Sequence, residues 1–473
     1  MARIADTTQL LDGGADRWLR AIGGAARLGA LQHQTLDGIA ISPLSGPAAI
    51  AGRYARAETA AWDIRALHGA GDPALMKKAI AEDLADGATS IAIKLATPGD
   101  FGLPPRYDAI ATALQGVPLN QVDITLLCGD QYFGAAQTML ALFEATGRSG
   151  YELRAGVLAD PLGTLARTGA LETGLWPALE LLGQFVAANV EPWPHVRLLL
   201  ADAALYHDAG ASEAQELAAM LATVVEYARV LDFDGVTAAD LFAHVTIKLA
   251  ADCDQFATIA KLRAARAVIA RLADSLGVPD AAGEVRLWAV TSQRMLTARA
   301  LHTNVLRNSI AAFSAAIGGA DAITVLPHDW AVGAASAYSR RLARNTHLLL
   351  ARESGLARVL DPGAGSGSIE ALTDALARRA WALFQEIEAG GGMAKALLAG
   401  RIQTAIVEMA ARREKLLADG ELTITSVTAF AASIDAAEPT CAHPDVAPIE
   451  RAETRVPALP VRRLSAQGEK HDR

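Results

Sequence analysis

Apolar runs of strand length alternate with helical segments along most of this chain. The runs are SIAIKLA from Ser90, VDITLLC from Val122, YELRAGVLA from Tyr151, VRLLLADAA from Val196, HVTIKLAA from His244, VRLWAVTSQ from Val285, AITVLPHD from Ala322 and ARVLDPG from Ala357. Nearly continuous apolar runs are typical of parallel strands that are buried on both faces. The pattern therefore predicts eight strands.

The segments between these runs carry apolar residues at the three and four spacing of an amphipathic helix. Examples are EAQELAAMLATVVEYARVL from Glu213 and NVLRNSIAAFSAAIGG from Asn304, the second of which ends in glycines that suit a helix terminus. Eight alternations of strand and helix predict an α/β fold, a (β/α)8 TIM barrel closed by parallel strands. An open doubly wound sheet is the alternative topology.

The hydropathy pattern also divides the chain into four parts. Residues 1–69 form a predicted N-terminal extension with an amphipathic stretch at 18–31, and residues 70–392 form the predicted barrel. Residues 393–434 form a C-terminal helical segment that ends in a strand-like run, TITSVTAF, from Thr423. Residues 435–473 are rich in Pro and charge and lack periodicity, which predicts a wrapping or disordered tail.

Composition narrows the class of protein. Apolar residues make up 52% of the 473 residues and aromatic residues only 5%, as expected for helices packed around a parallel sheet. A net charge of −9 argues against a nucleic-acid partner. Three scattered cysteines, Cys128, Cys253 and Cys441, argue against a disulfide framework or a structural zinc site. Without a signal-like or bilayer-length apolar run, we expect no membrane partner and a cytoplasmic location.

Polar side chains follow the predicted strands, where barrel enzymes place their reactive groups. They are Asp130, Asp160, Asp202, Asp252, Gln293, His328, Asp329 and Asp361, with His207 and Asp208 close behind the fourth run. Oxygen and imidazole ligands of this kind could bind a divalent cation. The alternative is that the aspartates cap the following helices by accepting backbone N–H bonds.

Two lysines and a glycine loop offer further candidate chemistry. Lys94 and Lys248 lie within apolar strand runs, where a desolvated amine could form a Schiff base, although an ion pair with a carboxylate is the alternative. The GAGSG loop at 363–367 could hold an anion at a helix N-terminus or could simply permit a tight turn. Trp62 and Trp381 are interpreted as core or interface anchors.

The run RVLDPGAGSGSIEALTDALARRAWALFQEIEAGGGMAKAL from Arg358 is the most specific segment of the sequence. It resembles the methylmalonyl-CoA mutases, whose DPxGGSxxxExLTxxLxxxAWxxFxxIExxGGMxxAL run is matched by Asp361, Pro362, Gly365, Ser366, Glu370, Leu372, Thr373, Ala380, Trp381, Phe384, Glu388, Gly391, Gly392, Met393 and Ala394. Similar segments occur in the same order at 62–65, 206–218, 256–268 and 340–356. The resemblance implies a barrel that serves the interconversion of methylmalonyl-CoA and succinyl-CoA with adenosylcobalamin.

The sequence departs from the catalytic members of that family. The resemblance aligns Ala204 and Leu205 with the family's Tyr-His pair, Ala159 with its Gln, and Ala57 with its N-terminal aromatic residue, while Tyr206 and His207 are two residues displaced from the pair. The family's cobalt-ligating Asp-x-His-x-x-Gly motif is absent, and the chain stops near where that domain would begin. We therefore expect no catalytic, cofactor-binding or metal-binding residue in this chain.

Together these features predict the small, noncatalytic subunit of a heterodimeric methylmalonyl-CoA mutase. Its partner would be the large subunit, which would carry adenosylcobalamin and the acyl-CoA substrate. Two alternatives stay open. One is the barrel subunit of a split acyl-CoA mutase that receives cobalamin from a separate domain. The other is a metal-dependent or Schiff-base barrel enzyme that uses His207, Asp208, His328 and Asp329, or Lys248.

Overall fold

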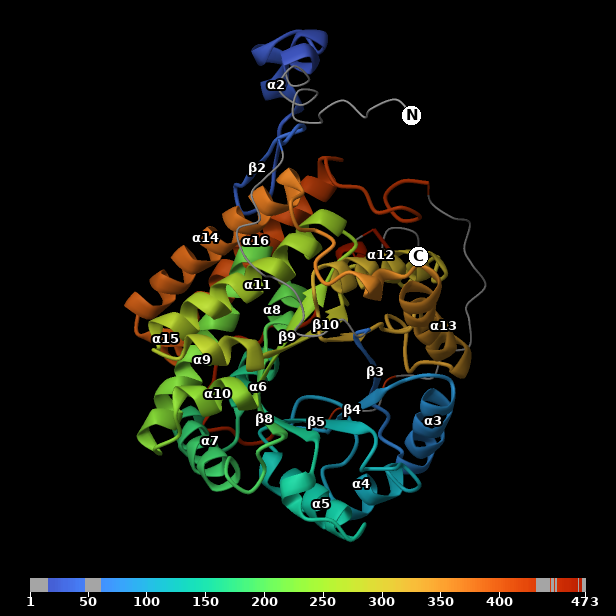
Figure 1. The fold of residues 1–473 in the computed structure, drawn as a ribbon, viewed down its shortest axis with the longest axis vertical. Helices are drawn as coiled ribbons and strands as arrows, with labels where there is room; N and C mark the ends of the chain where they lie inside the picture. The colour runs from blue at the N-terminus through green and yellow to red at the C-terminus, as the bar shows by residue number, and fades with distance from the viewer. Residues whose placement is uncertain are drawn as a thin grey trace, which may run out of the picture.

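Eight parallel strands form a closed barrel at the centre of the molecule (Figure 1). The computed structural model describes residues 16–46, 61–430, 443, 446, 449–466, 468 and 469. In barrel order the strands are β10 (Arg286–Thr291), β11 (Ala322–Thr324), β3 (Asp63–His68), β4 (Ser90–Lys94), β5 (Asp123–Gly129), β6 (Ala155–Ala159), β8 (Val196–Asp202) and β9 (Val245–Ala251). The predicted (β/α)8 barrel is confirmed, and the open sheet is excluded.

Helices surround the barrel, and each barrel strand is followed in the sequence by at least one helix (Figure 1). They are α3 (Pro73–Ala85), α4 (Tyr107–Ala113), α5 (Tyr132–Glu144), α6 (Pro161–Thr168), α7 (Leu175–Asn189), α8 (Ala204–Ala209), α9 (Glu213–Phe233), α10 (Ala238–His244), α11 (Gln255–Ser275), α12 (Thr303–Ile317), α13 (Ala337–Leu348), α14 (Gly367–Ala389), α15 (Gly392–Leu398) and α16 (Arg401–Ala418). The core lies between this layer and the strands.

The prediction of a strand at Ala357 is wrong. Residues there form a 3-10 turn, η4 (Leu356–Arg358), and the following Val359 and Leu360 are exposed. The eighth strand is instead β3, which pairs with β11 and β4 and lies inside the predicted extension of residues 1–69. The barrel therefore begins before residue 70, and the other proposed domain boundaries stay predictions.

Strand β3 has polar residues on its inner face, which explains why its sequence is not a continuous apolar run. Ile64, Ala66 and His68 alternate with Asp63, Arg65 and Leu67, and the His68 ring lies 3.1 Å from Asp83 of α3, outside the barrel. Arg65 points the opposite way, since its guanidinium lies 5.2 Å from the centroid of the Trp288 ring, and its Nε donates to Ser90 Oγ of β4 at 3.0 Å. Alternating polar and apolar residues indicate a strand with one polar face, which here is the barrel interior.

An N-terminal arm, residues 16–46, stands away from the barrel (Figure 1). It contains helix α2 (Ala25–Leu31) and the antiparallel pair β1 (His33–Gln34) and β2 (Ala40–Ile41). Asp37 attaches the arm to the start of α9, because its carboxylate accepts hydrogen bonds from Ser212 Oγ and, at 3.1 Å, from the Ala214 N–H. None of the side chains described in this arm is buried.

The C-terminal residues that the structure describes lie against the barrel. Strand β12 (Thr454–Arg455) pairs with β7 (Ala170–Leu171), and η5 (Leu464–Ala466) follows it. Residues 449–466 therefore wrap around the barrel, which is the first of the two alternatives predicted for the tail. The rest of the predicted tail includes residues outside the described part. The strand-like run from Thr423 is wrong, because it forms turns with a single bridge between Thr425 and Ala429.

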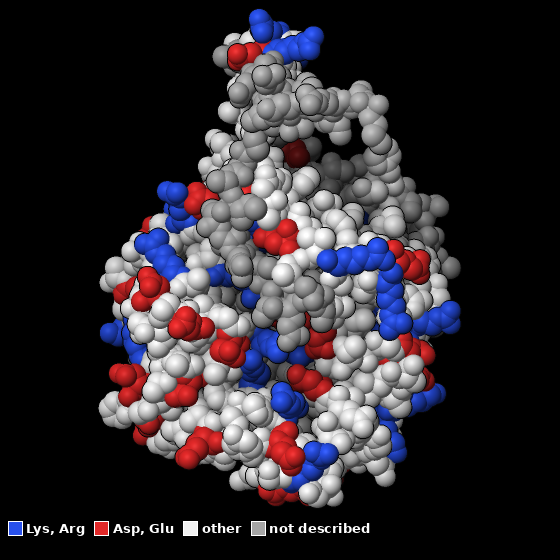
Figure 2. Space-filling view, viewed as in Figure 1, with Lys and Arg blue, Asp and Glu red and all other residues white. Residues whose placement is uncertain are grey.

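The structure also shows how charged residues and cysteines are placed. On the face drawn in Figure 2, Lys and Arg side chains are interspersed with Asp and Glu. No helix in the described part of the chain is long and apolar enough to cross a bilayer. Cys128 and Cys253 are free thiols, while Cys441 lies outside the described residues.

Candidate functional site

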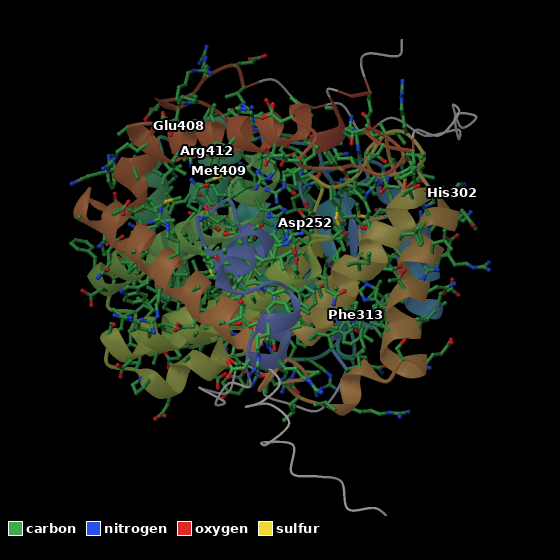
Figure 3. The ribbon with its side chains drawn as sticks, turned by 90° about the horizontal axis from the view of Figure 1, so that it is seen from above. Asp252, His302, Phe313, Glu408, Met409 and Arg412 are labelled. Atoms are coloured by element: carbon green, nitrogen blue, oxygen red, sulfur yellow. The ribbon has the colours of Figure 1, made fainter. Side chains whose placement is uncertain are left out.

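The mouth of the barrel, the end at which the strands terminate, gathers most of the polar residues expected there. Asp130, Asp160, Asp202, Asp252, Gln293, His328 and Asp329 each end or follow a barrel strand. Asp361 does not belong to this set, because no strand precedes it and it forms an ion pair with Arg263 of α11 in the outer layer. Figure 3 shows Asp252 near the middle of the molecule, with Glu408, Met409 and Arg412 on α16 to one side.

Asp160 caps a helix, as the structural alternative predicts. Its carboxylate accepts from the Gly163 N–H at 2.8 Å at the start of α6, and the Tyr227 hydroxyl donates to it at 2.6 Å. Burial raises the pKa of Asp160 to about 6, although the Tyr227 hydrogen bond opposes that shift. Sequence reasoning did not single out Tyr227, which comes from the distant helix α9.

A chain of ion pairs crosses the barrel interior near the mouth. Lys94 Nζ lies 2.5 Å from Asp100, which lies 3.1 Å from Arg167, which in turn lies 3.5 Å from Asp202. Lys248 Nζ completes the chain at 2.9 Å from Asp202. Both candidate lysines are thus held in ion pairs rather than facing an open site.

Lys94 has the lower basicity that a Schiff-base lysine needs. Burial lowers its pKa to about 8, while the Asp100 carboxylate works in the opposite direction. The ammonium also lies 3.8 Å from the centroid of the Phe101 ring, so aromatic carbon covers it on one side. The amine therefore has suitable chemistry, but the Phe101 ring lies against it and itself lines the mouth cavity.

Trp288 fills the barrel axis below this ion-pair chain. Its side chain is fully buried, and its indole N–H donates to Thr324 Oγ1 at 2.9 Å. The Arg65 guanidinium lies 5.2 Å and the Lys248 ammonium 5.5 Å from its ring centroid, from β3 and β9 respectively. The Trp288 indole, with two cations near its ring, therefore occupies the centre of the barrel.

Two separate cavities lie at opposite ends of the barrel. A cavity of about 510 Å³ at the strand beginnings is lined in part by Trp288, Arg154, Arg197 and Arg286. Another cavity of about 520 Å³ lies at the mouth. They share no lining residue, as expected if Trp288 and the ion pairs separate them.

His207 and its neighbours form a second buried cluster beside the mouth. The imidazole Nδ1 lies 3.3 Å from Glu216, and Nε2 lies 3.2 Å from Asp252 and 3.0 Å from Ser292 Oγ. Burial raises the pKa of Asp252, but the hydrogen bonds from His207 and the charge of Arg294 outweigh it and hold the pKa well below its ordinary value. The His207 imidazole thus lies between the carboxylates of Glu216 and Asp252.

Of the proposed cation ligands, His207 and Asp252 lie together, but Asp208 and His328 have other partners. Asp208 accepts from the backbone N–H groups of Gln293 at 3.0 Å and Arg294 at 3.2 Å, which ties α8 to the loop after β10. His328 instead stacks on His302, with ring centroids 5.3 Å apart. Across the described ranges, no group of three or more His, Cys, Asp or Glu side chains could hold a metal ion.

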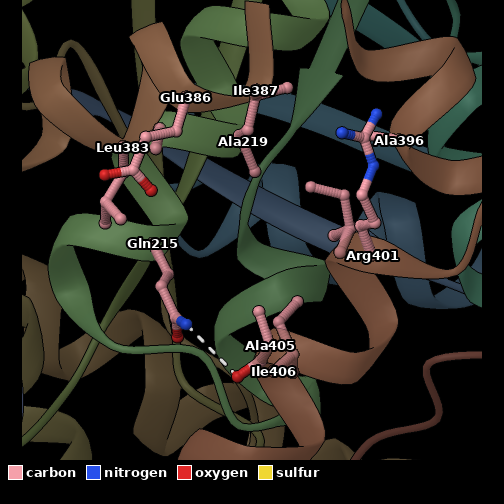
Figure 4. A pocket seen from close by; sticks show the side chains of 11 residues that line it. Gln215, Ala219, Leu383, Glu386, Ile387, Ala396, Arg401, Ala405 and Ile406 are labelled. Carbon is pink, nitrogen blue, oxygen red and sulfur yellow. Dashed lines mark hydrogen bonds between the residues drawn. The ribbon is translucent and has the colours of Figure 1, made fainter. Parts of the chain in front are cut away.

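A groove on the outer helices is unrelated to the mouth. The side chains of Leu383 and Ile387 of α14 face Ala219 of α9 and Ile406 of α16 across about 280 Å³ (Figure 4). The Gln215 amide closes one end by donating to the Ala405 carbonyl at 3.2 Å.

Comparison with known proteins identifies the family. The profile of the methylmalonyl-CoA mutase family matches residues 52–470. The small subunit of methylmalonyl-CoA mutase from Streptomyces virginiae is 44% identical over 78% of this chain and 58% of its own length. This chain belongs to the methylmalonyl-CoA mutase family. The corresponding small subunit from Propionibacterium freudenreichii subsp. shermanii is 37% identical over 78% of this chain and 57% of its own length.

Methylmalonyl-CoA mutase from Escherichia coli is more distant, at 28% identity over 85% of this chain and 61% of its own length. The chain thus spans somewhat more than half the length of these curated relatives. The methylmalonyl-CoA mutase resemblance that the sequence predicts is confirmed, and the barrel is the part of the family that the structure describes.

The residues expected from the sequence to stand in place of the mutase family's polar groups are buried and apolar. Ala159 ends β6 with no exposure, and Ala204 and Leu205 begin the short helix α8. Tyr206 and His207 follow on the same helix and are also buried. Ala57, aligned with the family's N-terminal aromatic residue, lies outside the described residues.

The most conspicuous family motif, the glycine loop at 363–367, has a structural role here. Glu370 accepts from the Gly365 N–H at 3.0 Å, and its carboxylate lies 2.7 Å from the buried Arg263 guanidinium. Gly365 has φ +79°, a conformation that favours glycine. The loop donates inward to its own helix, so the anion-site interpretation is not supported.

Aromatic side chains and the C-terminal segment line the cavity at the mouth of this barrel. Phe101 and Trp330 lie with ring centroids 6.4 Å apart, and the Trp330 N–H donates to Gln293 at 3.1 Å. Residues 461–463 of the C-terminal segment form another wall of the same cavity. This cavity of about 520 Å³ is partly open, and aromatic rings and the chain's own C-terminal backbone occupy part of the mouth.

Proposed function

We propose that this chain is the small, noncatalytic subunit of a heterodimeric methylmalonyl-CoA mutase. The large subunit would bind adenosylcobalamin and the acyl-CoA substrate and interconvert (R)-methylmalonyl-CoA and succinyl-CoA in the cytoplasm. This chain would stabilise that subunit through a barrel that keeps the family's framework. No nucleic acid or membrane takes part.

The filled barrel axis carries this proposal. A substrate that reaches a barrel's mouth along its axis needs space and polar partners, and catalysis needs groups that bind the transition state. Here Trp288 and the pairs Lys94–Asp100 and Lys248–Asp202 occupy that space, and each ionic group already has a partner. Names of the most similar small subunits support the same assignment for this chain.

The N-terminal arm supports a partner of some kind. An arm without buried side chains gains little from the hydrophobic effect within its own chain. Its apolar residues include Ile41 and Leu44, which are 38% and 42% exposed. A second subunit could bury this surface.

The test is co-expression of this chain with the large mutase subunit of the same organism. We expect a stoichiometric complex that converts methylmalonyl-CoA when adenosylcobalamin is added, and no conversion by this chain alone. Turnover by the isolated chain with adenosylcobalamin would overturn the proposal. So would failure of the two chains to co-purify.

A further inference from the structure

The described C-terminal residues 449–466, here called the strap, follow the rim of the mouth. A Cβ on Gly99, after β4, would lie 2.7 Å from Ile449. The strap then pairs with β7 after β6, reaches α8 after β8, and ends at the loop after β10. It therefore contacts the loops that follow four of the eight barrel strands.

Backbone hydrogen bonds hold the strap at regular intervals. The N–H groups of Val456, Leu459, Arg462 and Leu464 donate to the carbonyls of Gly169 at 2.9 Å, Ala166 at 2.8 Å, Asp208 at 2.8 Å and Arg294 at 3.0 Å. In addition, the Leu175 N–H donates to Thr454 Oγ1 at 3.0 Å. Bonds spread over the whole segment indicate a fixed path, because each orders the backbone on both sides.

Buried side chains anchor the strap between these bonds. Leu459 is 3% exposed and packs in the main core, and Ser465 is 1% exposed. Gly169 accommodates the strap closely, because a Cβ there would lie 2.7 Å from the Val456 carbonyl oxygen. By contrast, Val461 is 46% exposed.

The strap also forms a wall of the mouth cavity. Val461, Arg462 and Arg463 line it together with Phe101 and Trp330, which come from the loops after β4 and β11. The strap therefore borders the space in which barrel enzymes place their chemistry, together with side chains from several rim loops.

We propose that the strap is an intramolecular cover over part of the mouth of this barrel, and that the rim loops beneath it depend on it for their order. This inference concerns the chain by itself and does not depend on the identity of its partner. It differs from simple packing of a tail, because packing alone would leave the rim loops unchanged when the strap is released.

The test uses Leu459→Asp, which places a charge at the buried anchor, with Val461→Asp as the matched control. Gly169→Val attacks the same contact from the barrel side. Tryptic cleavage after Arg455 and Arg462, together with hydrogen exchange of peptides that cover 95–103 and 292–298, is measured on the full chain. Circular dichroism checks that the barrel is folded.

We expect Leu459→Asp and Gly169→Val to speed cleavage of the strap roughly tenfold or more and to raise exchange in both rim peptides. Val461→Asp should match the unmodified chain. If the strap is released while the rim peptides stay protected, the rim loops are ordered without the strap and the proposal fails. It fails equally if Leu459→Asp cleaves no faster than Val461→Asp. Neither result depends on whether a large subunit binds.

Discussion

Glu216 is the residue that holds the buried cluster beside the mouth together. It has no exposure, pairs with Lys261 at 2.6 Å, and accepts from the Ala250 N–H at 2.7 Å. Burial raises its pKa, but the Lys261 ammonium and the His207 imidazole outweigh that effect and hold the pKa at about 2. Its charge is therefore part of the folded state.

Replacing Glu216 with Gln should lower the free energy of unfolding at pH 7 by about 3–5 kcal/mol, because Lys261 is left buried without a carboxylate. The folded-state pKa lies below the ordinary value of 4.5, so this contribution is complete above pH 4.5 and is lost as pH falls toward about 2. Urea unfolding of both proteins between pH 3 and 7 measures the difference, which should shrink with acid.

Glu180→Gln is the control for that prediction, since Glu180 is exposed on α7 and should change stability by less than about 0.5 kcal/mol. A difference between Glu216→Gln and the unmodified chain that did not depend on pH would contradict the role of the charge.

Trp288 offers a test of how far the barrel depends on its filled axis. Trp288→Ala removes a fully buried indole and should cost about 3–5 kcal/mol, with a lower Tm in calorimetry. Trp176→Ala, at a position that is 51% exposed, should have a much smaller effect. Equal losses would show that the barrel axis collapses around the missing ring or is open to water.

At the scale of elements, Arg263 links three parts of the outer layer. It lies on α11, has no exposure, and pairs with Asp361 in the loop before α14 and with Glu370 inside α14. This link fixes the segment that sequence patterns misidentify as a strand. The turn η4 packs on the same layer through Leu356, which contacts the cluster of Ile259, Ile317 and Ile369.

Arg263→Leu should therefore release residues 356–366 and destabilise the chain by about 3–5 kcal/mol, because two carboxylates lose their buried partner. Hydrogen exchange of a peptide covering 356–366 measures the release. Arg271→Leu, on the exposed face of the same helix, should leave that peptide unchanged. Protection that survives Arg263→Leu would mean that apolar contacts of Leu356 alone hold the loop.

The sequence predicted strands correctly where both faces of the strand are buried. Strands such as β4 and β9 are mostly apolar on both faces, with one hydroxyl residue and one lysine each, so their runs were evident. It failed at β3, because Asp63 and Arg65 face a polar barrel interior. It failed at Val359 and Leu360 for the opposite reason, since they are apolar but 55% and 38% exposed.

The sequence predicted where the candidate site lies but not what its residues do. Strand ends located Asp160, Asp202 and Asp252 at the mouth, since parallel strands share one edge. Their partners Tyr227, Arg167 and Arg294 come from helices and loops, and no local spacing connects them. Only these long-range contacts show that Asp202 and Asp252 are neutralised by arginines and that Asp160 accepts from a tyrosine hydroxyl.

At the scale of the whole molecule, the decisive question is whether any group in this barrel takes part in turnover. Lys94 is the strongest candidate, because burial lowers its pKa to about 8 and an amine near neutrality can act as a nucleophile. Lys248 is the second candidate. Both Asp100 and Asp202 also contact Arg167, so each carboxylate keeps a cation when its lysine is removed.

We therefore expect Lys94→Met and Lys248→Met to leave the kcat of the assembled complex within about twofold of the unmodified value, because neither amine would touch the substrate. Activity is measured per mole of complex after size-exclusion chromatography, so that poorer assembly is not mistaken for slower chemistry. Borohydride added during turnover should leave no label on this chain. A loss of about a hundredfold in kcat with normal assembly would place chemistry in this barrel and favour the Schiff-base alternative.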